Sequence, residues 1–174
     1  MALGHRAHVR LAPFVRHFLV EEIAPGKRED APAPAMLGFE ALQAGGTPTD
    51  TAAFRRPTPR LAEGKALAPL VSAMMDVSDG LLIDSARLAE ASGVTIAIDS
   101  DAVPLPPALP AARAADAMRW GDDYELLFTL PGGVTPPCPA WRIGSVEPQA
   151  PHPLLVDGTP PAGRLGYVHG AHDN

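Results

Sequence analysis

The sequence predicts an α/β (α+β) fold from three neighbouring patterns. Residues 73–77 form a short apolar run with the length of a buried strand, and residues 80–92 carry apolar side chains at helical spacing. Val94, Ile96 and Ile98 then alternate with the residues between them, the period of a half-buried strand. Strand, helix and strand within about 26 residues are typical of a βαβ-like unit.

Composition supports one domain of ordinary size, or one domain with a loose tail. The 174 residues are 46% hydrophobic and only 5% aromatic, so the core is built from aliphatic residues and alanine. A formal net charge of −6 gives no electrostatic reason to expect nucleic acid or an anionic membrane as a partner. No stretch has the length and apolarity to span a bilayer, and a secretory signal is lacking. We therefore expect a soluble, cytoplasmic protein.

The first 30 residues are assigned to a leader or a helix. One side of that helix would consist of Leu11, Phe14, Val15, Phe18 and Leu19. Prolines among charged residues predict a linker or loop over residues 24–35. A helix is expected from about Ala35 to Gln43, and the glycine pair at 45–46 closes it.

A polar, proline-containing loop is expected from Thr47 to Pro59. Its end holds three arginines around two prolines: Arg55, Arg56 and Arg60. Guanidinium groups bind phosphate in a bidentate manner, so these arginines are one candidate phosphate site. The alternative is an exposed basic loop that precedes a helix over residues 60–67. The residue types favour this alternative over a phosphate site.

The strand–helix junction at residues 76–80 is the first candidate site. In an extended backbone Asp76 and Ser78 point to the same side, and Asp79 follows at the start of the helix. Alternatively, Ser78 or Asp79 simply caps the helix. Capping leaves Asp76 unexplained, because a carboxylate inside an apolar run is costly to bury without a cation or hydrogen-bond donors.

A second acidic turn comes after an alanine-rich segment, 108–118, that should be partly helical. Gly121 precedes Asp122 and Asp123, and an apolar run at 126–130 follows as a buried strand. Carboxylates thus lie at two strand ends, although a hairpin or turn with solvated acids is the alternative. Short strands are expected at 141–146 and 153–158.

Several segments, in order and spacing, resemble the carboxy-terminal domain of bacterial thiamine-monophosphate kinases. They are residues 76–81 (Asp-Val-Ser-Asp-Gly-Leu), 89–94, 98–99, 104–105 and 121–129 (Gly-Asp-Asp-Tyr-Glu-Leu-Leu-Phe-Thr), with flanking signatures at 56–60 and 166–169. The resemblance covers about residues 31–169, so we assign residues 31–174 to this domain. It implies a mixed sheet covered by helices, as in the carboxy-terminal domain of the aminoimidazole ribonucleotide synthetase superfamily.

The resemblance implies transfer of the γ-phosphoryl group of ATP to thiamine monophosphate, giving thiamine diphosphate, with magnesium ions. It implies that Asp76 and Asp79 bind Mg²⁺, that Ser78 touches the nucleotide phosphates, and that Asp122 and Tyr167 contact thiamine monophosphate. Hard oxygen ligands suit this chemistry, because cations must neutralise the crowded phosphate oxygens. No catalytic side chain is assigned.

Two departures from the family pattern affect these expectations. Trp120 replaces a family glycine, and its indole is expected to crowd the substrate pocket. Residues 1–30 do not resemble the family's amino-terminal domain, which carries further magnesium-binding aspartates and much of the dimer contact. We therefore expect a second half on another chain and no kinase activity from this chain alone, while the family itself suggests a homodimer.

Two alternative functions stay open. One is another enzyme of the superfamily, such as selenophosphate synthetase or the hydrogenase-maturation protein that handles carbamoyl groups. The Gly-Asp-Asp-Tyr-Glu-Leu motif at 121–126 argues against both. The other is a non-catalytic remnant that binds a thiamine phosphate or a protein partner.

Overall fold

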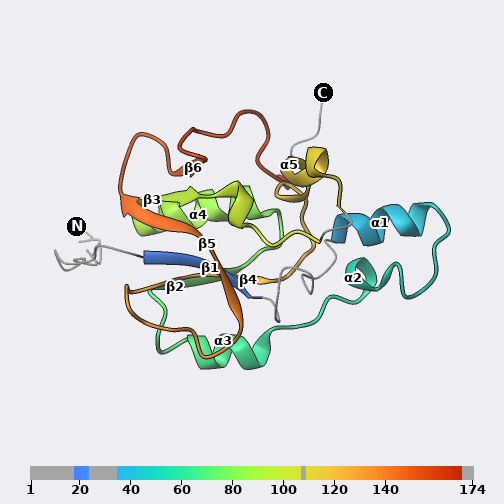
Figure 1. Ribbon diagram of the computed structural model, residues 1–174, viewed down its shortest axis with the longest axis horizontal. Coiled ribbons are helices and arrows are strands. Elements are labelled where there is room, and N and C mark those ends of the chain that lie inside the picture. The colour runs from blue at the N-terminus through green and yellow to red at the C-terminus, as the bar shows by residue number, and fades with distance from the viewer. Residues whose placement is uncertain (1–17, 24–34, 107–108, 170–174) are drawn as a thin grey trace, which may run out of the picture.

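A six-stranded sheet forms the centre of the computed structural model, which describes residues 18–23, 35–106 and 109–169 (Figure 1). The strand order is β2-β4-β1-β5-β3-β6. Neighbours are antiparallel except β3 and β6, which are parallel, so the sheet is mixed as predicted. The strands are β1 (Phe18–Ile23), β2 (Ala73–Asp76), β3 (Val94–Ile98), β4 (Leu126–Leu130), β5 (Ala140–Pro148) and β6 (Leu154–Val156).

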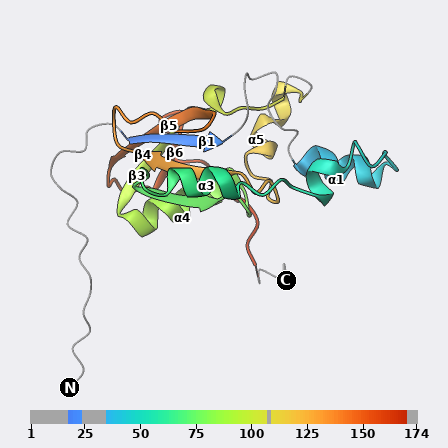
Figure 2. The same ribbon diagram turned by 90° about the horizontal axis from the view of Figure 1, so that it is seen from below.

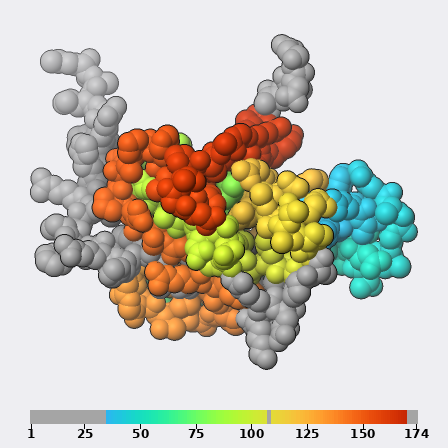
Figure 3. Space-filling view, turned by 45° about the horizontal axis from the view of Figure 1, so that its top comes forward, coloured from blue at the N-terminus to red at the C-terminus, as the bar shows by residue number. Residues whose placement is uncertain are grey.

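Five α-helices accompany the sheet within the described ranges. They are α1 (Ala35–Gln43), α2 (Ala52–Arg55), α3 (Leu61–Leu67), α4 (Leu81–Ser92) and α5 (Ala114–Ala117). Helices α1 and α2 lie beside the sheet at one end of the molecule, next to α5 (Figures 1, 2 and 3). The predicted helices over 35–43, 60–67 and 80–92 are confirmed, and the loop at 47–59 contains the additional short helix α2.

Alternate residues of β4 divide the core between the two faces of the sheet. Leu127 packs in one cluster with α4, whereas Phe128 and Leu130 pack with Leu67 of α3 in another. Successive side chains of a strand point to opposite faces. Helices α4 and α3 therefore cover opposite faces of the sheet, and β4 is buried between them.

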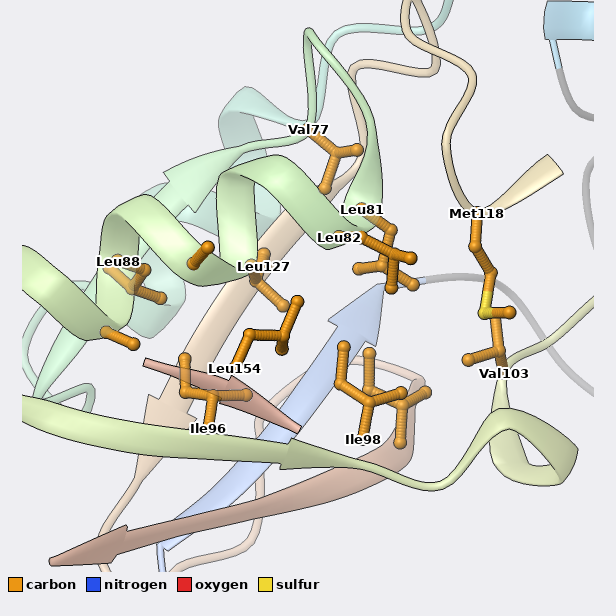
Figure 4. Packing of buried hydrophobic residues seen from close by; sticks show 13 residues of the cluster. Val77, Leu81, Leu82, Leu88, Ile96, Ile98, Val103, Met118, Leu127 and Leu154 are labelled. Carbon is orange, nitrogen blue, oxygen red and sulfur yellow. The ribbon is translucent and has the colours of Figure 1, made fainter. Parts of the chain in front are cut away.

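The larger cluster joins α4 to β3, β4 and β6. Figure 4 shows Leu82 and Leu88 of α4 above Ile96 and Leu154. Leu82, Ile96 and Leu154 are at most 2% exposed, and burying each such side chain contributes roughly 1.5–3 kcal/mol. This packing fixes the position of α4 on the sheet. The first turn of α4, next to residues 76–80, is thereby fixed as well.

The strand–helix–strand unit is present, but its two strands are not neighbours. Strands β2 and β3 run in the same direction, with β4, β1 and β5 between them. Strand β1 comes from the first 30 residues, and its backbone pairs with β4 and β5. Of the helix considered for residues 11–19, residues 11–17 lie outside the described residues. Residues 18 and 19 belong to strand β1 and not to a helix.

Ser85 in the middle of α4 is fully buried, and its hydroxyl has no hydrogen-bond partner within the described ranges. We expect Ser85→Ala to raise the free energy of unfolding by about 1–2 kcal/mol, because it removes an unsatisfied polar atom and favours the helix. Chemical unfolding followed by circular dichroism measures the change.

Ser92→Ala is the matched control, because Ser92 lies in the same helix but is exposed. Only the propensity gain of a few tenths of a kcal/mol is expected there. A loss of stability in Ser85→Ala would show that the hydroxyl has a partner in solution.

Candidate functional site

The loop after β2 and the loop before β4 are joined by their backbones. The N–H of Val77 donates to the carbonyl of Glu125 at 2.8 Å, and the N–H of Tyr124 donates to the carbonyl of Val77 at 2.8 Å. The N–H of Asp122 then donates to the carbonyl of Ser78 at 2.9 Å. These bonds continue the β2–β4 pairing beyond the last residue of β2. The two acidic motifs are therefore held against each other.

Two glycines allow this close approach. A Cβ atom at Gly121 would lie 2.5 Å from the carbonyl oxygen of Ser78. A Cβ atom at Gly166 would overlap the carbonyl oxygen of Asp79, and the next residue, Tyr167, donates its N–H to that same oxygen at 2.8 Å. Only glycine leaves room for a second backbone at such positions. The carboxy-terminal segment is thereby joined to the same site.

Asp84, not Ser78 or Asp79, satisfies the backbone at the start of α4. The prediction that Ser78 or Asp79 caps the helix is wrong, because Gly80 is the N-cap and no side chain bonds there. Instead one carboxylate oxygen of Asp84 accepts the N–H groups of Ser78 at 3.0 Å and Asp79 at 2.9 Å. Asp84 is fully buried. Its position on the apolar face of the helix was the only sequence signal for this role.

Both carboxylate oxygens of Asp79 already have partners. Arg87 donates through Nη1 to one oxygen at 2.5 Å and also to Asp84 at 2.8 Å. The Nε2 atom of His169 lies 3.3 Å from the other oxygen. A cation at Asp79 would therefore share or compete for oxygens that already contact the guanidinium and the imidazole.

Asp76 differs from its predicted environment. It is exposed at the end of β2, so no cation is needed to compensate for its burial. It lines a separate cavity of about 600 Å³ together with α3 and Tyr124. Among the described residues, no three His, Cys, Asp or Glu side chains gather to hold a metal ion. Asp76 and Asp79 are suitable magnesium ligands in kind, but these residues do not form a complete site.

Four of the five predicted site residues line one cavity of about 570 Å³, which we call the motif cavity. They are Ser78, Asp79, Asp122 and Tyr167. The remaining wall contains two aromatic side chains, two arginines and a histidine: Trp120, Tyr124, Arg119, Arg164 and His169. The motif cavity therefore combines carboxylates, aromatic faces and cations.

Tyr124 lies among the acids and was not predicted as a site residue. Its hydroxyl donates to Asp122 at 3.2 Å. The charge of Asp122 is the main reason that the pKa of Tyr124 is raised, with smaller contributions from burial and from Asp76 and Asp79. Three carboxylates thus act on one phenol, which indicates a negative potential on this side of the motif cavity.

Aromatic contacts order the other side of the motif cavity. The guanidinium carbon of Arg164 lies 5.7 Å from the ring centroid of Tyr167, and His169 meets the same ring edge-on at 4.9 Å. The Trp120 ring packs on Phe39 of α1 at 5.5 Å. Its indole therefore serves as a wall of the motif cavity and as an anchor for α1.

The arginine motif before α3 is divided between two roles. Arg60 donates to both oxygens of Glu125, at 2.8 and 2.7 Å, and both side chains are largely buried. Burial raises the pKa of Glu125, and Arg60 opposes that rise. Arg60 is therefore part of the framework and is not free to bind phosphate. Arg55 and Arg56 are exposed, as the alternative of a basic loop predicted.

Asp123 turns away from the motif cavity. Its carboxylate accepts the N–H of Ala35, the first residue of α1, at 2.7 Å. Burial raises its pKa to about 7, with smaller contributions from the charges of Glu125 and Asp122, while the Ala35 bond opposes the rise. Adjacent acids in one motif thus have different environments.

We expect Asp84→Asn to lower the free energy of unfolding by about 2 kcal/mol. The amide retains one acceptor oxygen for the Ser78 and Asp79 N–H groups but loses the ion pair with Arg87, which leaves buried polar groups imperfectly paired. Urea unfolding measures the loss. Glu90→Gln, an exposed change in the same helix, is the control and should stay within about 0.5 kcal/mol. Equal effects would contradict the role of Asp84.

The raised pKa of Asp123 predicts that the folded chain loses stability as the pH rises. From about pH 4 to about pH 7 the folded chain holds a proton on Asp123 that the unfolded chain has released. The free energy of unfolding should therefore fall as the pH rises through this range, by an amount on the order of 3 kcal/mol, and then level off. Urea unfolding across this range measures the decline.

Asp123→Asn isolates this contribution, because the amide oxygen can still accept the Ala35 N–H but the side chain never ionises. The decline should be absent in this variant and present in Asp116→Asn, an exposed acid of α5. A decline that survives in Asp123→Asn would assign it to other groups.

Comparison with known proteins identifies the family to which this domain is related. The family model "AIR synthase related protein, C-terminal domain" matches residues 35–135. The chain is 45% identical over 83 residues to the thiamine-monophosphate kinase of Salmonella typhimurium. This aligned region covers 44% of this chain and 25% of that enzyme. The resemblance to the carboxy-terminal domain of these kinases is thereby confirmed.

Solved structures agree with the fold. The thiamine-monophosphate kinase of Stenotrophomonas maltophilia superposes with a TM-score of 0.68 at 26% identity, covering 82% of this chain and 50% of that one. AaThiL complexed with AMPPCP and TMP superposes with a TM-score of 0.63 at 28% identity, covering 87% and 52%. The chain thus spans between a quarter and about half the length of these relatives. Since the family model matches more than half of the sequence and the fold agrees, the chain belongs to the AIR synthase related proteins, with residues 35–135 matching their carboxy-terminal domain.

Proposed function

We propose that the chain forms the carboxy-terminal half of a thiamine-monophosphate kinase site. The reaction would join a phosphate oxygen of thiamine monophosphate to the γ-phosphorus of ATP and break the bond to ADP, giving thiamine diphosphate. The observation that carries this proposal is the gathering of Ser78, Asp79, Asp122 and Tyr167 around one motif cavity. A solved relative that binds AMPPCP and TMP supports it.

The charges of the motif cavity suit the proposed substrate. Thiamine monophosphate carries a cationic thiazolium ring and an anionic phosphate. Asp122, Tyr124 and Tyr167 provide negative charge and aromatic faces for the cation. Arg164 provides positive charge for the phosphate, and His169 contributes a ring nitrogen to the same wall. Arg119 is less available, because it donates to three backbone carbonyls.

We assign the nucleotide and metal roles to the first motif. The Ser78 hydroxyl has no hydrogen-bond partner among the described residues, so it is available to a phosphate oxygen. Asp76 and Asp79 would contribute carboxylate ligands to Mg²⁺, which neutralises phosphate charge when bound. Asp79 would then exchange a partner, and further ligands would come from outside the described ranges.

The assembly we propose includes a second half-site and a homodimer in the cytoplasm. The chain covers 50% of the solved Stenotrophomonas relative, so a further segment of comparable size accompanies this domain there. That second half would act in the same chain or in another. Across the described residues, we find no helix with the length and apolar character to cross a membrane.

A non-catalytic module that binds thiamine phosphate is the second candidate. It is favoured by one observation: both oxygens of Asp79 are engaged by Arg87 and His169. Dependence of binding on magnesium distinguishes the two candidates.

Isothermal calorimetry with thiamine monophosphate tests the substrate role. We expect binding that Mg²⁺ and AMPPCP strengthen and that Asp122→Asn weakens at least about tenfold, because a charge-assisted contact is lost. Asparagine tolerates the φ of 69° at this position, so the backbone is retained. Glu147→Gln, an exposed acid in β5 that does not line the motif cavity, should bind like the parent.

Three outcomes decide between the candidates. No binding by a chain that circular dichroism shows to be folded would reject the proposed half-site. Binding without any response to Mg²⁺ would favour the non-catalytic module. We expect no thiamine diphosphate from this chain by itself, and turnover that Asp76→Ala abolishes would show that the chain holds a complete metal site.

A further inference from the structure

The pair of acidic loops has a second cavity on its other side. This second cavity has a volume of about 210 Å³, and its walls include Val77, Asp123 and Glu125. None of its lining residues lines the motif cavity. Ser78 and Asp122 line the motif cavity, whereas their sequence neighbours Val77 and Asp123 line the second cavity.

The polar groups of the second cavity leave one cation without a partner. Arg60 and Glu125 neutralise each other through two hydrogen bonds. One oxygen of Asp123 accepts the N–H of Ala35. Arg56 lines the same cavity, is exposed to solvent, and pairs with no group among the described residues. The cavity therefore offers an uncompensated guanidinium at its solvent side.

The second cavity has an apolar part beside its buried polar groups. Val77, Leu81, Val103 and Met118 are at most 6% exposed. A volume of about 210 Å³ corresponds to roughly seven water molecules of about 30 Å³ each. Such a space accommodates a small organic molecule. Small-molecule sites are typically apolar cavities with a few polar groups that set the orientation.

We propose that the second cavity binds a small organic monocarboxylate, with its carboxylate on Arg56 and its apolar body against Val77, Leu81 and Met118. A guanidinium binds a carboxylate through two parallel hydrogen bonds, and the apolar residues beside it favour an anion that carries an organic body. This site is independent of the proposed kinase function. A bound molecule would contact the neighbours in sequence of Ser78 and Asp122.

The ionisation of Asp123 adds a pH dependence to this site. The charged groups around Asp123 are Glu125, Asp122, Arg56 and Arg60. Burial raises the pKa of Asp123 to about 7, so at lower pH its neutral carboxyl can donate a hydrogen bond to an anion. At higher pH its negative charge repels the same anion. Carboxylate binding should therefore weaken as the pH rises through 7.

Titration of the ¹⁵N-labelled chain with benzoate, followed by NMR, tests the proposal. Benzamidine is the matched probe, because it has the same ring with the opposite charge. We expect saturable shifts at Val77, Leu81 and Met118 with benzoate and none with benzamidine. Arg56→Met should weaken benzoate binding at least about tenfold, since it removes a charge-assisted contact. Arg55→Met, the adjacent exposed arginine that does not line the cavity, should leave binding unchanged.

The pH arm uses Asp123→Asn. In the parent chain, benzoate should bind several-fold more weakly at about pH 8 than at about pH 6, and in Asp123→Asn the two affinities should be equal. The absence of saturable shifts in the folded chain would overturn the proposal. Benzamidine binding as well as benzoate, equal losses in the two arginine variants, or shifts confined to residues of the motif cavity would also overturn it.

Discussion

The backbone pairing between residues 77–79 and 122–125 is the constraint on which the site depends. Each motif is short and polar, and alone it would be an ordinary solvated turn. The hydrogen bonds of Val77, Asp122 and Tyr124 join the two turns, and Gly121 leaves the room that this contact requires. Because the pairing extends the β2–β4 ladder, the stability of the sheet supports the geometry of both cavities.

The ion pairs of α4 stabilise the loop after β2 and also engage one of its carboxylates. Asp84 satisfies two N–H groups of the first loop and is itself paired with Arg87, so a buried carboxylate is tolerated. The same guanidinium also donates a hydrogen bond to the carboxylate of Asp79. The interaction that orders the loop therefore competes with any cation for the same carboxylate. The ion pair that stabilises the folded chain therefore opposes the availability of Asp79 to a cation.

Adjacent residues of the paired loops lie in two different chemical environments. Asp122 lies in the motif cavity beside Tyr124, whereas Asp123 is withdrawn towards Ala35 at the start of α1. A similar division separates Arg56 from Arg60. In both cases adjacent or nearby residues of identical type differ because burial and partners differ. Residue type alone therefore does not assign their roles.

Local pattern in the sequence determined the helices over 35–43, 61–67 and 81–92, strands β2, β3 and β4, and the two acidic motifs, because apolar periodicity and glycine positions act over a few residues. Only the tertiary structure decided that β1 joins the sheet, that Asp84 holds the first loop, and that Asp76 lies outside the cavity shared by Ser78, Asp79, Asp122 and Tyr167. These features depend on contacts between segments far apart in the chain, and no short-range pattern carries that information.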